Sequence, residues 1–138
     1  MQSVPVNWLA VLVVTVGKFI LGFVWFGLIF GKQWQALTGV SQEAMKKGMA
    51  RAIVTDLVTT FIMAWVLAYI VSLAGKFYGP PTWQGGAIGG FFCWLGFVGS
   101  ISLSTQTYEG KSPKLWLIGN AYQLIALVIM GSVLAVWR

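Results

Sequence analysis

Four long apolar stretches divide the chain, and each is near or above the roughly 20 residues that a helix needs to cross the hydrocarbon core of a membrane. They cover about residues 4–30, 50–74, 83–104 and 115–137. Short polar segments separate them and contain helix breakers such as Pro80, Pro81 and Gly110. The pattern predicts an all-α, polytopic membrane protein in which residues 1–138 form a single transmembrane domain with four transmembrane helices.

The first apolar stretch is predicted to remain in the mature protein. It has no basic segment before it, is too long for a secretory signal peptide and carries Lys18 near its centre. In the polar segment that follows, Ser41 can cap a helix because its hydroxyl accepts a hydrogen bond from a free amide, and Glu43 suits the positive end of the helix dipole. That helix is expected to continue through Arg51 into the second span.

Composition excludes an ordinary soluble domain and most kinds of chemistry. Hydrophobic residues make up 58% of the chain and charged residues 9%, whereas a soluble domain carries roughly 25% charged residues. The chain has no histidine, three acidic residues and one cysteine, so neither a disulfide framework nor a clustered set of metal ligands can be assembled. Groups for general acid–base catalysis are equally few. We therefore predict no enzymatic activity, no metal site and no cofactor.

Topology, and not nucleic-acid binding, explains the net charge of +6. Basic residues near the ends of membrane spans favour the cytoplasmic side. One predicted side carries six of them, namely Lys32, Lys46, Lys47, Arg51, Lys111 and Lys114. The other side carries Lys76 and Arg138. Both termini are therefore expected on the outer side, with the lipid bilayer as the main partner and no nucleic acid.

Two apolar phrases recur in the same order and at nearly the same offset. Residues 23–27 (FVWFG) match residues 92–96 (FCWLG) at an offset of 69 positions, and residues 62–68 match residues 129–135 at an offset of 67. Chance similarity is the alternative explanation, because apolar helices use few residue types. A true repeat would give two two-helix halves related by a pseudo-twofold axis along the membrane normal.

Several phrases resemble a known family. They are residues 7–10 (NWLA), 22–25 (GFVW), 30–34 (FGKQW), 95–97 (LGF), 108–113 (YEGKSP), 122–124 (YQL) and 130–131 (MG). The family comprises small four-helix bacterial membrane proteins catalogued as domain of unknown function 1761, and the resemblance covers nearly the whole chain. It implies a four-span protein of the bacterial inner membrane and supplies no activity. It implies nothing about Lys18, where a small or apolar residue would be expected.

Lys18 and Asp56 are the charges that the apolar spans tolerate least. A lysine at the centre of a membrane helix costs about 2.5–3.5 kcal/mol on insertion scales. With a helical rise of about 1.5 Å per residue, Asp56 lies about 9 Å and Lys18 about 18 Å below the basic surface. The two meet only if Lys18 bends toward the cytoplasm. Lys18 is therefore either a side chain that reaches alone to the nearer wet surface or part of an anion or counter-ion site.

Further polar residues gather in the cytoplasmic half. Thr59 and Thr60 follow Asp56 at i+3 and i+4, and Asn120 and Gln123 share one face of the fourth span. All lie within roughly 14 Å of the basic surface. They form either interhelical hydrogen bonds, worth about 0.6 kcal/mol each, or the lining of a wet or ligand-filled pocket. The candidate ligand or ion site comprises Lys18, Asp56, Thr59, Thr60, Asn120 and Gln123.

Glycines in the third span are spaced so that another helix can approach closely. The candidate packing residues are Gly85, Gly86, Gly89, Gly90 and Gly96. Their partner is either another helix of the same chain or a second copy in a homo-oligomer. Two functional classes remain: a small transporter or channel-like protein that handles a ligand, and an accessory or scaffold subunit that packs against another membrane protein. Ligand handling is favoured, because packing alone requires neither Lys18 nor Asp56.

Overall fold

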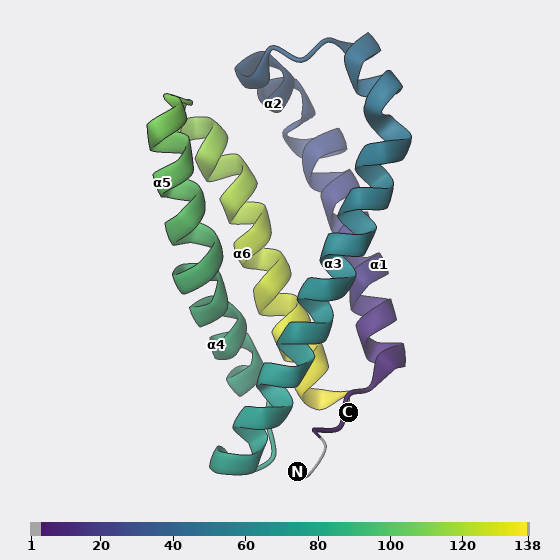
Figure 1. The fold of residues 1–138 in the computed structure, drawn as a ribbon, viewed down its shortest axis with the longest axis vertical. Helices are drawn as coiled ribbons and strands as arrows, with labels where there is room; N and C mark the ends of the chain where they lie inside the picture. The colour runs from purple at the N-terminus through teal and green to yellow at the C-terminus, as the bar shows by residue number, and fades with distance from the viewer. Residues whose placement is uncertain (1–3, 138) are drawn as a thin grey trace.

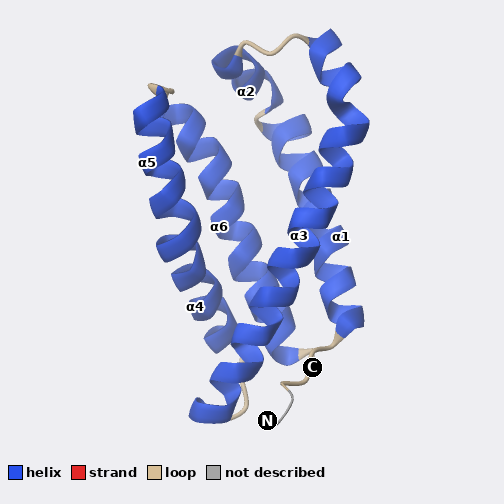
Figure 2. Ribbon diagram, in the orientation of Figure 1, coloured by secondary structure: helices blue, strands red, loops and turns tan. Residues whose placement is uncertain are grey.

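The computed structural model describes residues 4–137, which form helices joined by short turns (Figures 1 and 2). In chain order these are α1 (Trp8–Phe23), η1 (Val24–Ile29), α2 (Gly31–Thr38), α3 (Gln42–Tyr78), α4 (Trp83–Cys93), η2 (Trp94–Gly99), α5 (Ser100–Glu109) and α6 (Pro113–Val136). The η segments are π-helical turns, one continuing α1 and one joining α4 to α5. Four helical stretches are long and apolar enough to cross a membrane, namely Trp8–Ile29, Gln42–Tyr78, Trp83–Glu109 and Pro113–Val136. The prediction of an all-α protein with four such helices is confirmed.

Local sequence explains where the helices begin and end. The Ser41 hydroxyl accepts a hydrogen bond from the Ala44 amide at 3.1 Å, so the predicted cap begins α3. Because α3 continues unbroken to Tyr78, the capped segment and the second span are one helix. Gly110 follows α5 with a φ of 68°, a left-handed conformation that suits glycine. The sequence pattern missed α2, because its eight residues are too few to show a clear helical period.

The chain ends and the basic segments lie at opposite ends of the bundle. The described N- and C-terminal residues and the turn between α3 and α4 share one end (Figure 1). The other end holds α2, the start of α3 and the turn between α5 and α6 (Figure 1). The six basic residues predicted to face the cytoplasm belong to these three segments. They are therefore collected at one end of the molecule.

The core lies where α1, α3 and α6 meet. Val11, Ala64 and Ala126, one from each helix, are at most 1% exposed. Alanine and valine leave little volume between the backbones, so the three helices approach closely over their apolar halves. This junction also holds the base of the polar site described below.

Glycine brings α4 and α6 into backbone contact. A Cβ atom added at Gly86 would collide with the carbonyl oxygen of Gly131, and one added at Gly90 would collide with the carbonyl oxygen of Leu127. The helices can approach this closely only because these positions carry no side chain. Two of the predicted packing glycines thus act within the chain, and their partner Gly131 on α6 was not predicted.

At the other three predicted packing glycines, no other helix of residues 4–137 would lie against an added Cβ atom. A Cβ atom added at Gly89 or Gly96 would meet nothing within 4 Å, and one at Gly85 would meet only the Thr82 hydroxyl of the adjacent cap. Adjacent helix positions point about 100° apart, so Gly89 and Gly90 cannot face the same neighbour. The third span therefore carries an inner glycine face, packed on α6, and an outer glycine face.

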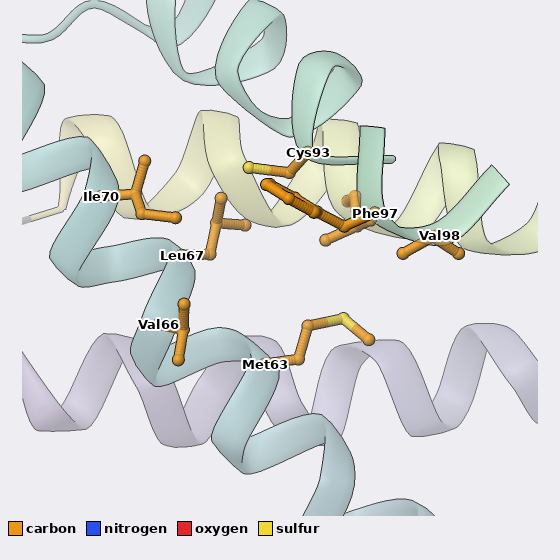
Figure 3. Close-up of a pocket in the computed structure, with 8 residues that line it drawn as sticks. Met63, Val66, Leu67, Ile70, Cys93, Phe97 and Val98 are labelled. Carbon is orange, nitrogen blue, oxygen red and sulfur yellow. The ribbon is translucent and has the colours of Figure 1, made fainter. Parts of the chain in front are cut away.

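An apolar cavity of about 460 Å³ lies between α3 and the third span (Figure 3). Its α3 wall is formed by Met63, Val66, Leu67 and Ile70. The opposite wall is formed by Cys93, Phe97 and Val98 of the third span, together with Leu127 of α6. The third span packs against α6 over much of its length, whereas α3 approaches it over only a short length. The bundle is therefore closely packed between α4 and α6 and more open along α3.

Candidate functional site

Lys18 extends from α1 into the junction with α3 and α6, where only 4% of the residue is exposed. Its Nζ donates a hydrogen bond to Thr60 Oγ1 at 3.2 Å and lies 3.7 Å from Asp56 Oδ1. The same Nζ lies 4.9 Å from the centroid of the Tyr122 ring, within the range of a cation–π interaction. Lys18 therefore bends toward Asp56 and does not reach a wet surface alone.

The two charges of this ion pair differ greatly in exposure. The Lys18 side chain is 2% exposed and the Asp56 side chain 43%. Their separation of 3.7 Å fits an ion pair but exceeds the usual range of about 2.7–3.2 Å for an N–H···O hydrogen bond. The ammonium group is thus enclosed by protein, whereas the carboxylate can still accept hydrogen bonds from another donor.

Tyr122 brings α6 into the site and was not among the predicted site residues. It is 4% exposed, and its hydroxyl donates a hydrogen bond to the Lys18 carbonyl oxygen at 3.0 Å. Gly22 leaves room for this hydroxyl, because a Cβ atom there would lie only 2.9 Å from Tyr122 Oη. An aromatic ring is a common partner for a buried ammonium group, but the sequence did not indicate which ring would meet Lys18.

An aromatic cluster continues from Tyr122 toward the basic end of the bundle. Phe26 lies 5.2 Å from Tyr122 and 6.3 Å from Trp34, and Trp25 lies 4.8 Å from Phe30, all between ring centroids. Tilted and edge-on pairs of this kind contribute about 0.5–1.5 kcal/mol each beyond their burial. The cluster joins η1, α2 and α6, and so holds the short helix α2 beside the site.

Thr59 does not join the site, although it follows Asp56 by three positions. It is exposed on the outer surface of α3, and its hydroxyl donates to the carbonyl oxygen of Thr55 at 2.9 Å. Thr60 is 1% exposed and faces Lys18. Positions i+3 and i+4 point about 100° apart, so only one of the two threonines can face α1.

Asn120 belongs to a second polar cluster, between α5 and α6. Its Oδ1 accepts a hydrogen bond from Ser102 Oγ at 2.7 Å, its Nδ2 donates to the Trp116 carbonyl oxygen at 3.0 Å, and Trp116 Nε1 donates to Ser102 Oγ at 3.0 Å. Gln123 makes no hydrogen bond to the Lys18 group, and its buried Oε1 has no hydrogen-bond partner within residues 4–137. The single polar layer expected from the sequence is therefore divided into two clusters, one around Lys18 and one around Asn120. The Asn120 cluster links α5 to α6.

The phrases that build these contacts all lie within one match to a family model, which covers residues 9–135. The chain belongs to the family described as Protein of unknown function (DUF1761). This confirms the resemblance noted in the sequence. No curated protein and no solved structure matches the chain.

In this DUF1761 chain, the tryptophans of the phrases FVWFG and FCWLG both form hydrogen bonds to the same turn of α6. Trp25 Nε1 donates to the Ile118 carbonyl oxygen at 3.0 Å, and Trp94 Nε1 donates to the Asn120 carbonyl oxygen at 2.9 Å. Trp25 lies in η1 and Trp94 begins η2. π-Helical turns often occur at functional sites, because they change the direction of side chains within a helix.

The Lys18 group combines charged, polar and aromatic side chains in one place. Within the described residues no three His, Cys, Asp or Glu side chains come together as metal ligands. What the group offers is a carboxylate, a hydroxyl, an ammonium and the face of an aromatic ring, from Asp56, Thr60, Lys18 and Tyr122. These are recognition groups for charge.

Proposed function

We propose that this DUF1761 protein is a small transporter or channel-like protein that handles a charged ligand in the cytoplasmic half of the membrane. The observation that supports the proposal is the unequal exposure of the Lys18–Asp56 pair. A purely structural ion pair inside a bundle is stable when both charges are enclosed and hydrogen-bonded. A charge that remains partly open at membrane depth is typical of a ligand or ion pathway. The proposed function involves no enzymatic step.

Membrane location and orientation form part of the proposal. The protein is placed in the bacterial inner membrane with both termini outside, because the end of the bundle with six basic residues should face the cytoplasm. In a Cys93→Ser background, an impermeant thiol reagent added to intact cells is expected to label Gly79→Cys and not Gln42→Cys. Labelling of Gln42→Cys alone would reverse the orientation.

The proposal also includes a two-helix repeat, a common origin of transporter folds. One observation supports it. The phrases FVWFG and FCWLG, which are equivalent at the offset of 69, both run into π-helical turns. Asp56 and Gln123 are equivalent at the offset of 67, so the second half would carry an amide where the first carries a carboxylate.

Binding of two amphiphiles with equal chain length and opposite charge tests the function. Radiolabelled dodecylammonium and dodecanoate are added to the protein in nanodiscs, and empty nanodiscs are subtracted. We expect saturable binding of one of them, weakened at least tenfold by Thr60→Val, whose side chain lines the site. Asp56→Asn should weaken the binding of dodecylammonium as much, because it removes the counter-charge, and should not weaken the binding of dodecanoate. Thr59→Val, on the outer face of the same helix, is the matched control and should bind like the wild type. Absence of saturable binding for both amphiphiles would contradict the proposal.

An accessory or scaffold role is the second candidate, and the outer glycine face favours it. Gly85, Gly89 and Gly96 leave a surface on which a helix of a second copy, or of another membrane protein, can pack closely. If this face joins two copies, Gly89→Leu should lower the protein mass measured by light scattering in detergent to that of one chain. An unchanged mass in a folded variant would remove the homo-oligomer from consideration.

A further inference from the structure

We infer that the ligand of the Lys18 site is a primary ammonium cation, and that the Lys18 ammonium group itself occupies the position of that ligand. The inference rests on the proposed ligand-handling function. Lys18 Nζ is surrounded by a hydroxyl acceptor at 3.2 Å, a carboxylate oxygen at 3.7 Å and a ring centroid at 4.9 Å. A hydrogen-bond acceptor, a counter-charge and an aromatic face are the groups that recognise an ammonium ion.

The charge that the site presents to an incoming ligand is negative. The Asp56 side chain is 43% exposed, whereas the Lys18 side chain is 2% exposed. An anion would first meet the carboxylate, and like charges a few ångströms apart repel strongly in a medium of low dielectric constant. A cation meets its counter-ion first, although the Lys18 ammonium group 3.7 Å from that carboxylate repels it and must be displaced. The lysine and the basic end of the bundle alone would suggest an anionic ligand, but the geometry of the site favours a cationic one.

Lys18 makes few hydrogen bonds at this position and has space beside it. Within residues 4–137 its ammonium group makes one hydrogen bond, to Thr60, and lies too far from Asp56 for a second. Lys18 also lines an apolar groove of about 420 Å³ between α1 and α6, together with Gly17, Leu21, Ala126, Met130 and others. A cation that binds Asp56 therefore competes with the ammonium group for the carboxylate, and the groove leaves room for the apolar stem of Lys18 to shift. Competition from Lys18 keeps the affinity low, which allows release as well as binding.

Titration with butylammonium chloride tests this inference. Binding is followed by thermal unfolding of the protein in nanodiscs, at ionic strength held constant with sodium chloride. Lys18→Met is expected to bind butylammonium at least tenfold more tightly than the wild type, because the competing ammonium group is gone. Asp56→Asn and the double variant Lys18→Met/Asp56→Asn should lose the binding. Lys114→Met, which removes a positive charge at the basic end, is the control and should match the wild type.

Tetrabutylammonium separates recognition of a primary ammonium from general attraction of cations. It carries the same charge but cannot donate a hydrogen bond to Thr60, so Lys18→Met is expected to bind it at least tenfold more weakly than butylammonium. Should Lys18→Met fail to fold, the neutral variant Lys18→Gln carries the same expectation. Equal affinity of the neutral variant and the wild type for butylammonium, or binding that survives Asp56→Asn, would overturn the inference.

The sign of the ligand distinguishes failure of this inference from failure of the proposed function. Saturable binding of dodecanoate that is lost in Lys18→Met, without binding of butylammonium to any variant, would overturn the ammonium site and leave ligand handling in place. Absence of binding for ligands of both charges would contradict both.

Discussion

The substitution Gly90→Leu is expected to destabilise the protein by at least about 3 kcal/mol, because even the first atom of a side chain at this position would collide with the backbone of α6. The carbonyl group of Leu127 cannot move aside as a flexible side chain can, so α4 and α6 must separate. Their separation would also remove the glycine contact one turn away, between Gly86 and Gly131. The unfolding free energy in detergent, measured by circular dichroism during denaturation, checks this expectation.

Gly89→Leu is the matched control, since it adds the same side chain one position earlier, where a Cβ atom meets nothing within 4 Å. Its effect on the unfolding free energy should stay within about 0.5 kcal/mol. Gly131→Ala should resemble Gly90→Leu in direction, because a Cβ atom at Gly131 would collide with the carbonyl oxygen of Gly86. Equal effects of Gly89→Leu and Gly90→Leu would show that the third span is rotated differently about its axis.

Sequence spacing identified the glycines of the third span but could not divide them between two faces. Gly85 with Gly89 and Gly86 with Gly90 have the same spacing of four, so both pairs satisfy the rule for close approach. The rotation of the helix decides between them, and it depends on Gly131, which lies about 40 positions further along the chain. Interactions of this kind are outside what a local pattern contains.

In the polar site too, the sequence indicated how deep each residue lies in the membrane but not the direction in which its side chain points. Counting residues from the basic surface indicated that Lys18 meets Asp56 only if it bends toward the cytoplasm, and left open whether it does; in the structure the two lie 3.7 Å apart. The same counting placed Thr59 and Asn120 at a suitable depth but could not show that one faces outward and the other faces α5. Tyr122 was missed for a related reason. It lies 104 positions from Lys18 in the sequence, so no local pattern indicates their contact.

Asp56→Asn is expected to destabilise the protein much more than Lys18→Met. Removing the carboxylate leaves an ammonium group that is 2% exposed, and loss of one partner from a buried pair costs about 3–5 kcal/mol. Removing the ammonium leaves a carboxylate that is 43% exposed and so is less enclosed by protein, while methionine fills the enclosed volume with an apolar chain of similar length. We therefore expect Lys18→Met to change the unfolding free energy by less than about 1 kcal/mol.

The double variant Lys18→Met/Asp56→Asn identifies why Asp56→Asn lowers the unfolding free energy. If Asp56→Asn is unstable because it leaves the ammonium group unpaired, removing that group should return the unfolding free energy to within about 1 kcal/mol of the wild type. A loss that persists in the double variant would mean that Asp56 stabilises the fold through another contact. A loss in Lys18→Met as large as that in Asp56→Asn would mean that the pair holds α1 and α3 together, which favours the accessory role over ligand handling.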